Sequence, residues 1–147
     1  MEDFELQWDI DRPTGVSIQQ LDLVNLTPNE VSLERSPLNT LGSQALADLV
    51  QHPRTTQLAF PASDQADLQA RAEALLVEAG WFVNARLKAK FSVLQRVVRA
   101  HTMVTLDGAG ARHSGPYLVA GVFHSIDDAD HTMVIDLIRN GWNREGS

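Results

Sequence analysis

The chain has 147 residues and a mass of 16.2 kDa, which is long enough for one ordinary domain with its own hydrophobic core. Hydrophobic residues make up 44% and charged residues 21%, so the composition excludes a wholly disordered chain and a coiled coil. Its 12 basic and 19 acidic residues give a net charge of −7, which argues against general binding to the phosphates of nucleic acids.

The sequence contains no cysteine, and therefore no disulfide, no thiolate zinc site and no cysteine nucleophile. Residues 1–8 lack the basic start and apolar core of a signal peptide, and no segment is apolar enough for a transmembrane helix. We therefore expect a protein that is made and assembled in the cytoplasm.

Residues 1–60 predict short strands followed by a short helix. Phe4, Leu6 and Trp8 alternate with polar residues, and a second apolar series over residues 16–23 follows a turn at residues 13–15. Apolar residues at helical spacing over residues 45–50 predict a short helix that ends before Pro53.

The strongest local pattern is that of an amphipathic helix from about Asp64 to Ala79. Its apolar residues recur every three or four positions, and most of its charged residues fall outside that stripe. Residues 61–64 offer N-terminal cap residues, and Gly80 is expected to end the helix in the left-handed conformation. One side of this helix should lie on a sheet.

Four extended runs follow, over residues 81–91, 97–106, 117–125 and 131–139. Glycines in the segment 107–110 predict a tight turn, and Asp127–Asp130 predicts an acidic loop that joins the last two strands into a hairpin. These elements predict an α+β, β-rich fold: an antiparallel β-barrel-like sheet with one main amphipathic helix packed outside. We expect a single domain over residues 1–147.

Both faces of the strand at 117–125 are largely apolar. Simple alternation puts Val119 and Phe123 on one face, and Leu118 and Val122 on the other. A strand that is apolar on both faces needs cover on each, such as a barrel interior and a helix or neighbouring subunit. Leu118 and Val122 are therefore predicted to lie in an assembly interface. Trp142 lies outside the regular strand pattern and is either a core residue or an anchor in the same interface.

The densest group of metal-ligating residue types is suited to zinc, manganese or iron and comprises His124, Asp127, Asp128, Asp130 and His131. The candidate site within it is the trio His124, Asp127 and His131. Acidic residues also favour hairpin tips for another reason, because they accept hydrogen bonds from nearby backbone amides. A metal would need a further ligand, such as His101 or His113. We predict no metal and no cofactor, with a small metal-dependent enzyme built on this trio as the alternative.

Other segments that resemble functional motifs lack the neighbouring residues that those functions require. The glycine-rich segment 108–115 opens no helix and lacks the Gly-Lys-Ser/Thr ending of a phosphate-binding loop, and no Gly-x-Ser-x-Gly elbow is present. The basic residues between Arg86 and Arg99 alternate with apolar ones, as on a solvated strand face. The chain is therefore predicted not to be an enzyme, and a ligand-binding barrel with an internal cavity is a further alternative.

An ordered series of short motifs after Val104 resembles the phage late control D family, whose hub proteins are related to the N-terminal part of the type VI spike protein VgrG. The series comprises a glycine turn at 107–110, a Gly-Pro-Tyr-Leu-Val strand at 115–119, a Val-Phe-His strand end at 122–124 and a closing strand that ends in Arg139-Asn140. The resemblance is good over residues 61–142 and poor before them. It corresponds to the second barrel domain of the hub.

The resemblance implies a structural component of the baseplate hub of a phage tail or contractile injection system, which links the inner tube to the spike through self-association. It implies a trimer or a pseudo-hexameric ring, contacts with tube and spike proteins, and a final place in the virion or injection particle. No membrane insertion and no sequence-specific nucleic-acid binding are expected. An acidic wall around the lumen would repel acidic cargo and nucleic acid.

The sequence departs from the family pattern in two ways. Residues 84–102 contain no glycine, which predicts a longer or straighter strand pair in this region. Full hub proteins carry two related barrels, whereas this chain is predicted to hold one. The chain would then be an excised domain, a split hub or a reduced homologue, and the missing barrel would come from copies of this chain or from another protein.

Overall fold

The computed structural model describes residues 3–22, 27–59 and 64–144, which group into two compact units. The first unit holds the described residues up to Asp9, then Leu41–Gln44 and those from Trp81 onward. The second unit consists of Ile10–Thr40 and Ala45–Gly80. The expectation of a single barrel domain over 1–147 stays a prediction, since compactness alone does not establish independent folding.

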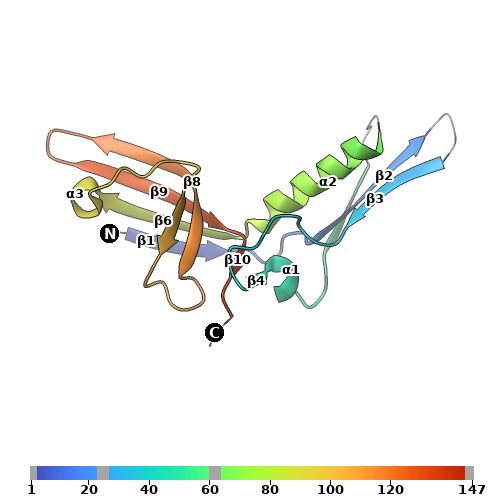
Figure 1. Cartoon of the computed structure of the whole chain (residues 1–147), viewed down its shortest axis with the longest axis horizontal. Helices are drawn as coiled ribbons and strands as arrows, with labels where there is room; N and C mark the ends of the chain where they lie inside the picture. The colour runs from blue at the N-terminus through green and yellow to red at the C-terminus, as the bar shows by residue number, and fades with distance from the viewer. Residues whose placement is uncertain (1–2, 23–26, 60–63, 145–147) are drawn as a thin grey trace. The chain divides into compact units, whose positions relative to one another are not determined.

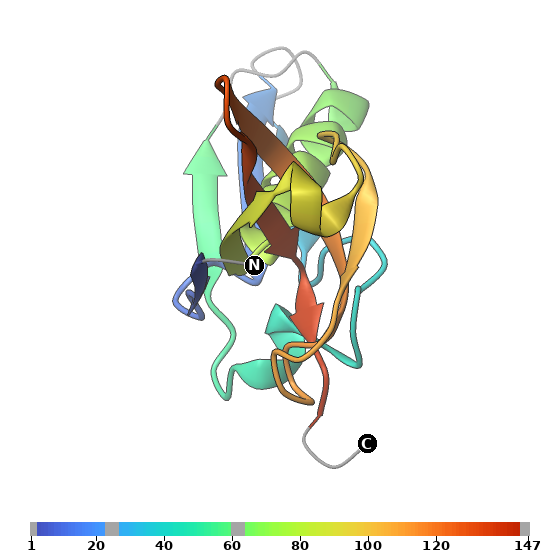
Figure 2. The same ribbon diagram turned by 90° about the vertical axis from the view of Figure 1, so that its left-hand side faces the viewer.

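The first unit is built on a five-stranded antiparallel sheet in the order β1-β6-β9-β8-β7 (Figures 1 and 2). The strands are β1 (Asp3–Trp8), β6 (Val83–Lys90), β7 (Met103–Leu106), β8 (Gly115–Ile126) and β9 (His131–Arg139). The sheet curls into a half-barrel, so the predicted β-rich α+β class and barrel-like sheet are confirmed. Two short strands, β4 (Gln44–Ala45) and β10 (Gly141–Trp142), pair with each other.

One face of the five-stranded sheet forms the core of the first unit. Over β6, β8 and β9, buried side chains on this face alternate with exposed or half-buried ones on the opposite face, as in a sheet that is covered on one side. The fully buried members from β6, β8 and β9 include Val83, Tyr117, Val119, Met133 and Leu137. We call this the inner face and the opposite one the outer face.

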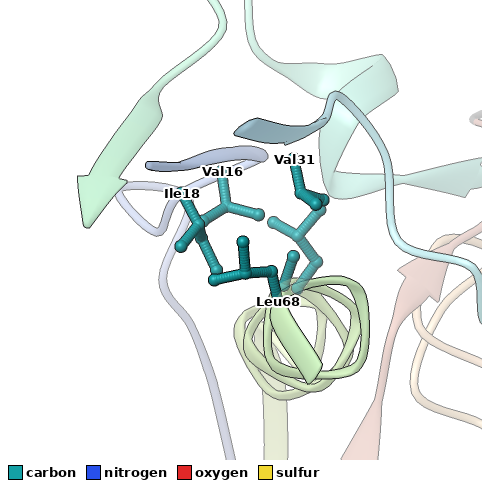
Figure 3. Close-up of a cluster of buried hydrophobic side chains, with 6 residues drawn as sticks. Val16, Ile18, Val31 and Leu68 are labelled. Carbon is teal, nitrogen blue, oxygen red and sulfur yellow. The ribbon is translucent and has the colours of Figure 1, made fainter. Parts of the chain in front are cut away.

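The second unit places the main helix on a different sheet from the one just described. Its strands β2 (Gly15–Asp22), β3 (Thr27–Leu33) and β5 (Thr55–Ala59) lie in the order β3-β2-β5, with β2 and β5 parallel. The helix α2 (Gln65–Gly80) packs on β2 and β3, and its apolar stripe meets theirs in a core (Figure 3). The buried residues of this core are Val16, Ile18, Val31, Leu68, Ala72 and Leu76.

The predicted bounds of α2 are confirmed to within one residue at each end, whereas its expected C-terminal cap is wrong. The Asp64 carboxylate accepts a hydrogen bond from the amide of Asp67 at 2.8 Å, which satisfies one of the free amides of the first turn. Gly80 belongs to the helix and has no positive φ, so the left-handed cap expected there is wrong. The short helix expected near residues 45–50 is α1 (Leu46–Leu49).

The strand predicted over residues 97–106 is wrong in its first half. After β6 the chain forms the short helix α3 (Phe91–Leu94), which contacts β6 and β9, and only Met103–Leu106 is a strand (Figure 2). Gln95 and His101 have φ angles of 51° and 62°, which no strand accommodates. The longer strand pair expected from the missing glycines is therefore wrong as well.

Candidate assembly surfaces

The Arg139-Asn140 pair of the closing strand ties three segments of the first unit together. Arg139 is buried, with 1% of its surface exposed, and its guanidinium donates to the backbone oxygens of Leu41 and Ser114 and to the side-chain oxygen of Asn143. The side-chain oxygen of Asn140 accepts the amide of Leu41 at 2.7 Å. These bonds satisfy a buried cation with fixed dipoles, so this motif stabilises the end of the sheet.

The end of the loop that precedes β8 lies against the Arg139 guanidinium group. Gly115 has a φ angle of 132°, and a Cβ atom there would lie 2.9 Å from an Arg139 nitrogen. The Arg139 guanidinium also lies 5.3 Å from the centre of the Tyr117 ring. Glycine at position 115 therefore permits both the backbone turn and the approach of the guanidinium group.

Trp142 lies in an aromatic cluster within the first unit. Its ring is 5.4 Å from the Phe82 ring, 6.2 Å from that of Trp8 and 5.7 Å from that of His113, and the Arg112 guanidinium lies 5.0 Å above it. Trp8 stays 51% exposed, so the cluster reaches the surface. These contacts give Trp142 a packing role inside the unit, and its predicted role in an assembly interface stays a prediction.

His113 occupies an unusual position in this aromatic cluster. Burial lowers the pKa of His113, and the nearby cations Arg112 and Arg139 lower that pKa further. Its Nδ1 atom is buried without a hydrogen-bond partner within the described part of the chain. The His113 ring stacks on Trp8 with 5.3 Å between centroids and therefore serves as an aromatic packing group.

A β-bulge changes the predicted faces of the β8–β9 hairpin. Val119 pairs with Leu137 and Gly121 with Asp136, so Ala120 is an extra residue on β8. From Gly121 onward, each side chain of β8 therefore lies on the face opposite to the one that strict alternation from Val119 would give. Val122, which pairs with Ile135, lies on the inner face with Val119, whereas Leu118 is on the outer face. The predicted common face of Leu118 and Val122 is therefore wrong.

The outer face carries an apolar stripe across β7, β8 and β9. Met103 pairs with Leu118 and Leu118 with Ile138, and farther along the hairpin Phe123 pairs with Val134. Met103 is 51% exposed and Phe123 69% exposed. The apolar stripe consists of Met103, Leu118, Phe123, Val134 and Ile138, and it includes two large exposed side chains that the sequence patterns did not single out.

Two strand edges of this sheet have open backbone groups among the described residues. β1 pairs only with β6, and β7 pairs with β8 only over residues 115–118. The backbone of Thr102 and His101 extends this contact to Val119, which leaves the far side of residues 121–126 without a neighbouring strand. Unpaired strand edges offer backbone donors and acceptors to another chain.

The rest of the outer face is polar and its charges are balanced. On β6, Arg86 lies 2.6 Å from the Asp136 carboxylate on β9, and hydrogen bonding to Asp136 raises the pKa of Arg86. Lys90 pairs with Asp130 at 3.1 Å. This part of the basic run is a solvated face with acidic partners, as the sequence predicted, and it offers no concentrated positive charge for phosphates.

The structure brings His124 and His131 together but not Asp127. The two imidazoles lie 3.0 Å apart, His124 through Nδ1 and His131 through Nε2. The Asp127 carboxylate instead accepts the amides of Ala129 and Asp130 at 2.9 and 2.7 Å, which lowers its pKa. Over residues 3–22, 27–59 and 64–144, no group of three or more His, Asp or Glu side chains could hold a metal ion.

A hollow of about 250 Å³ opens on the inner face between β6, β7, β9 and the segment after β6. Its lining is almost wholly apolar and includes Leu87, Leu94, Val104 and Ile135. This volume is below the range of about 300–1,000 Å³ that is usual for small-molecule pockets.

No described helix is long and apolar enough to cross a membrane.

Comparison with known proteins relates the chain to others through its fold. No family model matches the sequence, and no curated protein matches it. Its fold is similar to that of the 43 kDa tail protein of prophage MuSo2 from Shewanella oneidensis, with a TM-score of 0.68 and 12% sequence identity. A tail protein from Neisseria meningitidis MC58 gives a TM-score of 0.63, also at 12% identity.

Each similarity covers 95% of this chain but 40% of the other protein. The chain thus spans less than half the length of the tail proteins whose fold it shares. At such low sequence identity the likeness establishes a common fold and does not by itself establish a function.

Proposed function

We propose that the chain is a non-enzymatic structural component of the baseplate hub of a phage tail or contractile injection system. In this role it links the inner tube to the spike through self-association. The observation that carries the proposal is the fold similarity to two tail proteins over 95% of the chain. The late control D-like motif series after Val104 supports the hub as the specific location.

The surfaces of the first unit support a role in assembly. The apolar stripe presents Met103 and Phe123 to solvent, and the open edges of β1 and β8 can accept strands from neighbours. A large apolar side chain that becomes fully buried contributes about 1.5–3 kcal/mol, so burial of these two side chains would matter to a complex. Closed rings of identical subunits are the usual outcome of such association.

The partners follow from the proposed location. We expect a trimer or pseudo-hexameric ring, in contact with a tube protein and a spike protein, assembled in the cytoplasm and then carried in the particle.

The test is the mass of the intact chain in solution, measured by light scattering at several concentrations, alone and with the tube and spike proteins encoded nearby. The expected result is an oligomer, or a stable complex with at least one of the two proteins. Replacing Met103 and Phe123 by lysine should shift the equilibrium towards the monomer, because each lysine would bring an unpaired charge into the interface.

The matched control is Val93→Lys on α3, where an equally apolar side chain is 63% exposed outside the apolar stripe. This variant should associate like the unmodified chain. A strict monomer that binds neither protein at any concentration would refute the hub proposal. Equal association of the stripe variant and the control would refute the stripe as the interface.

A further inference from the structure

The tip of the β8–β9 hairpin holds two imidazole nitrogens that face each other. Nδ1 of His124 lies 3.0 Å from Nε2 of His131, on the inner face that also carries Met133. His124 is exposed, and the His131 ring stacks on Phe91 with 5.6 Å between centroids and an interplanar angle of 12°. Two strands and one stacked ring therefore fix this pair of nitrogens at a site that ions can reach.

We propose that His124 and His131 chelate one divalent transition metal ion of the Ni²⁺ or Cu²⁺ class. With metal–nitrogen bonds of about 2.1 Å, two nitrogens 3.0 Å apart subtend about 90° at the metal. This is the angle between neighbouring ligands in square-planar and octahedral complexes, and imidazole is a preferred ligand of both ions. A tetrahedral Zn²⁺ site would require the nitrogens to be about 0.4 Å farther apart.

The two facing nitrogens of His124 and His131 have different roles with and without a bound metal. Without metal, one neutral imidazole donates its proton to the lone pair of the other, so the pair forms one hydrogen bond. A metal accepts both lone pairs at once, and the proton between the rings moves to the outer nitrogen of the donor ring. Chelation therefore needs a change of tautomer and a turn of both rings, because ring centroids 5.2 Å apart and nitrogens 3.0 Å apart place the two lone pairs nearly along the line between the rings. The His124 ring is exposed and can make the larger part of this turn.

Charge around the pair favours a cation. The loop that joins the two histidine-bearing strands contains Asp127, Asp128 and Asp130, and the chain as a whole has a net charge of −7. Asp127 and Asp130 remain engaged with backbone amides and with Lys90, so they attract the ion through space without binding it. The other coordination positions would be filled by water.

The experiment is a calorimetric titration of the intact, tag-free chain with NiCl₂. We expect binding of one ion per chain. His124→Ala should weaken binding by about 100-fold, because a chelate gains roughly that factor over a single ligand. His131→Ala should have a similar effect. Asp127→Asn should retain the affinity to within a few fold, which separates a two-histidine site from a site that uses the carboxylate.

The control is His52→Ala, which removes an exposed histidine on a loop of the second unit. This variant should bind Ni²⁺ as the unmodified chain does. With Cu²⁺, paramagnetic resonance should detect two coordinated nitrogens in the unmodified chain and one in His124→Ala. Unchanged Ni²⁺ affinity in His124→Ala, or no binding by the unmodified chain at millimolar Ni²⁺, would overturn the proposal. The outcome is independent of whether the chain belongs to a tail hub.

Discussion

Single residues decide how the end of the first unit is held together. Arg139 has 1% of its surface exposed and is satisfied by oxygens from the chain at Leu41, Ser114 and Asn143. Removal of any of these contacts would leave a buried polar group without a partner, which costs about 1–3 kcal/mol. The arginine thus behaves as a structural cross-link between segments that are far apart in the sequence.

Gly115 and Gly110 provide a matched pair for testing this cross-link. Both have positive φ angles, but only at Gly115 would a Cβ atom meet the Arg139 guanidinium, whereas nothing lies within 4 Å of the position at Gly110. Gly115→Ala should lower the free energy of unfolding by about 2–4 kcal/mol, and Gly110→Ala by about 1 kcal/mol. Urea unfolding measures both, and equal losses would show that backbone conformation alone matters at position 115.

Among the elements, the bulge in β8 has the largest effect on which surfaces the sheet presents. One extra residue, Ala120, puts Val122 into the inner face and Phe123 onto the outer face. A regular strand would have reversed these two positions. The exposed apolar stripe and the face of the histidine pair both follow from this one insertion.

Deletion of Ala120 should therefore be tolerated far better than deletion of Val122. Without Ala120, Val119 and Gly121 can keep their partners Leu137 and Asp136, and every later side chain keeps its face. Without Val122 the rest of the strand must either slip by one residue or lose its inner-face side chain. We expect a higher urea midpoint for the first deletion than for the second, and the reverse order would contradict the role assigned to the bulge.

For the whole molecule, two spectroscopic signals can follow the unfolding of the two compact units separately. The three tryptophans all lie in the first unit, so their fluorescence reports on that unit alone. The long helix α2 lies in the second unit and dominates the helical signal in far-ultraviolet circular dichroism. The two probes can therefore be assigned to different parts of the chain.

Leu68→Ala and Leu137→Ala test the prediction of a single domain. Each residue has at most 1% of its surface exposed, in the second and first unit respectively, and each truncation should cost about 2–5 kcal/mol. In a single cooperative domain, either substitution shifts the fluorescence and dichroism transitions by the same amount. A Leu68→Ala variant that shifts only the dichroism transition would establish two separately folding units.

The sequence by itself determined the elements that depend on local patterns. The alternation in β1 and β2, the apolar stripe of α2 and the acidic turn between β8 and β9 all act over a few neighbouring residues, and each was predicted correctly. β3 lies within the stretch of short strands predicted before the first helix but was given no bounds, and β5 was missed. Both segments are short and become strands through pairing with β2.

Only the tertiary structure decided which side chains share a face of the sheet and which lie in contact. The bulge at Ala120 depends on the pairing of β8 with β9, and no periodicity in β8 alone reveals it. The approach of the two imidazoles, and the turning of Asp127 to its own loop, depend on the register of the same pair of strands. The grouping of Trp142 with Trp8 and Phe82 joins residues from opposite ends of the chain, and long-range packing of this kind leaves no local pattern.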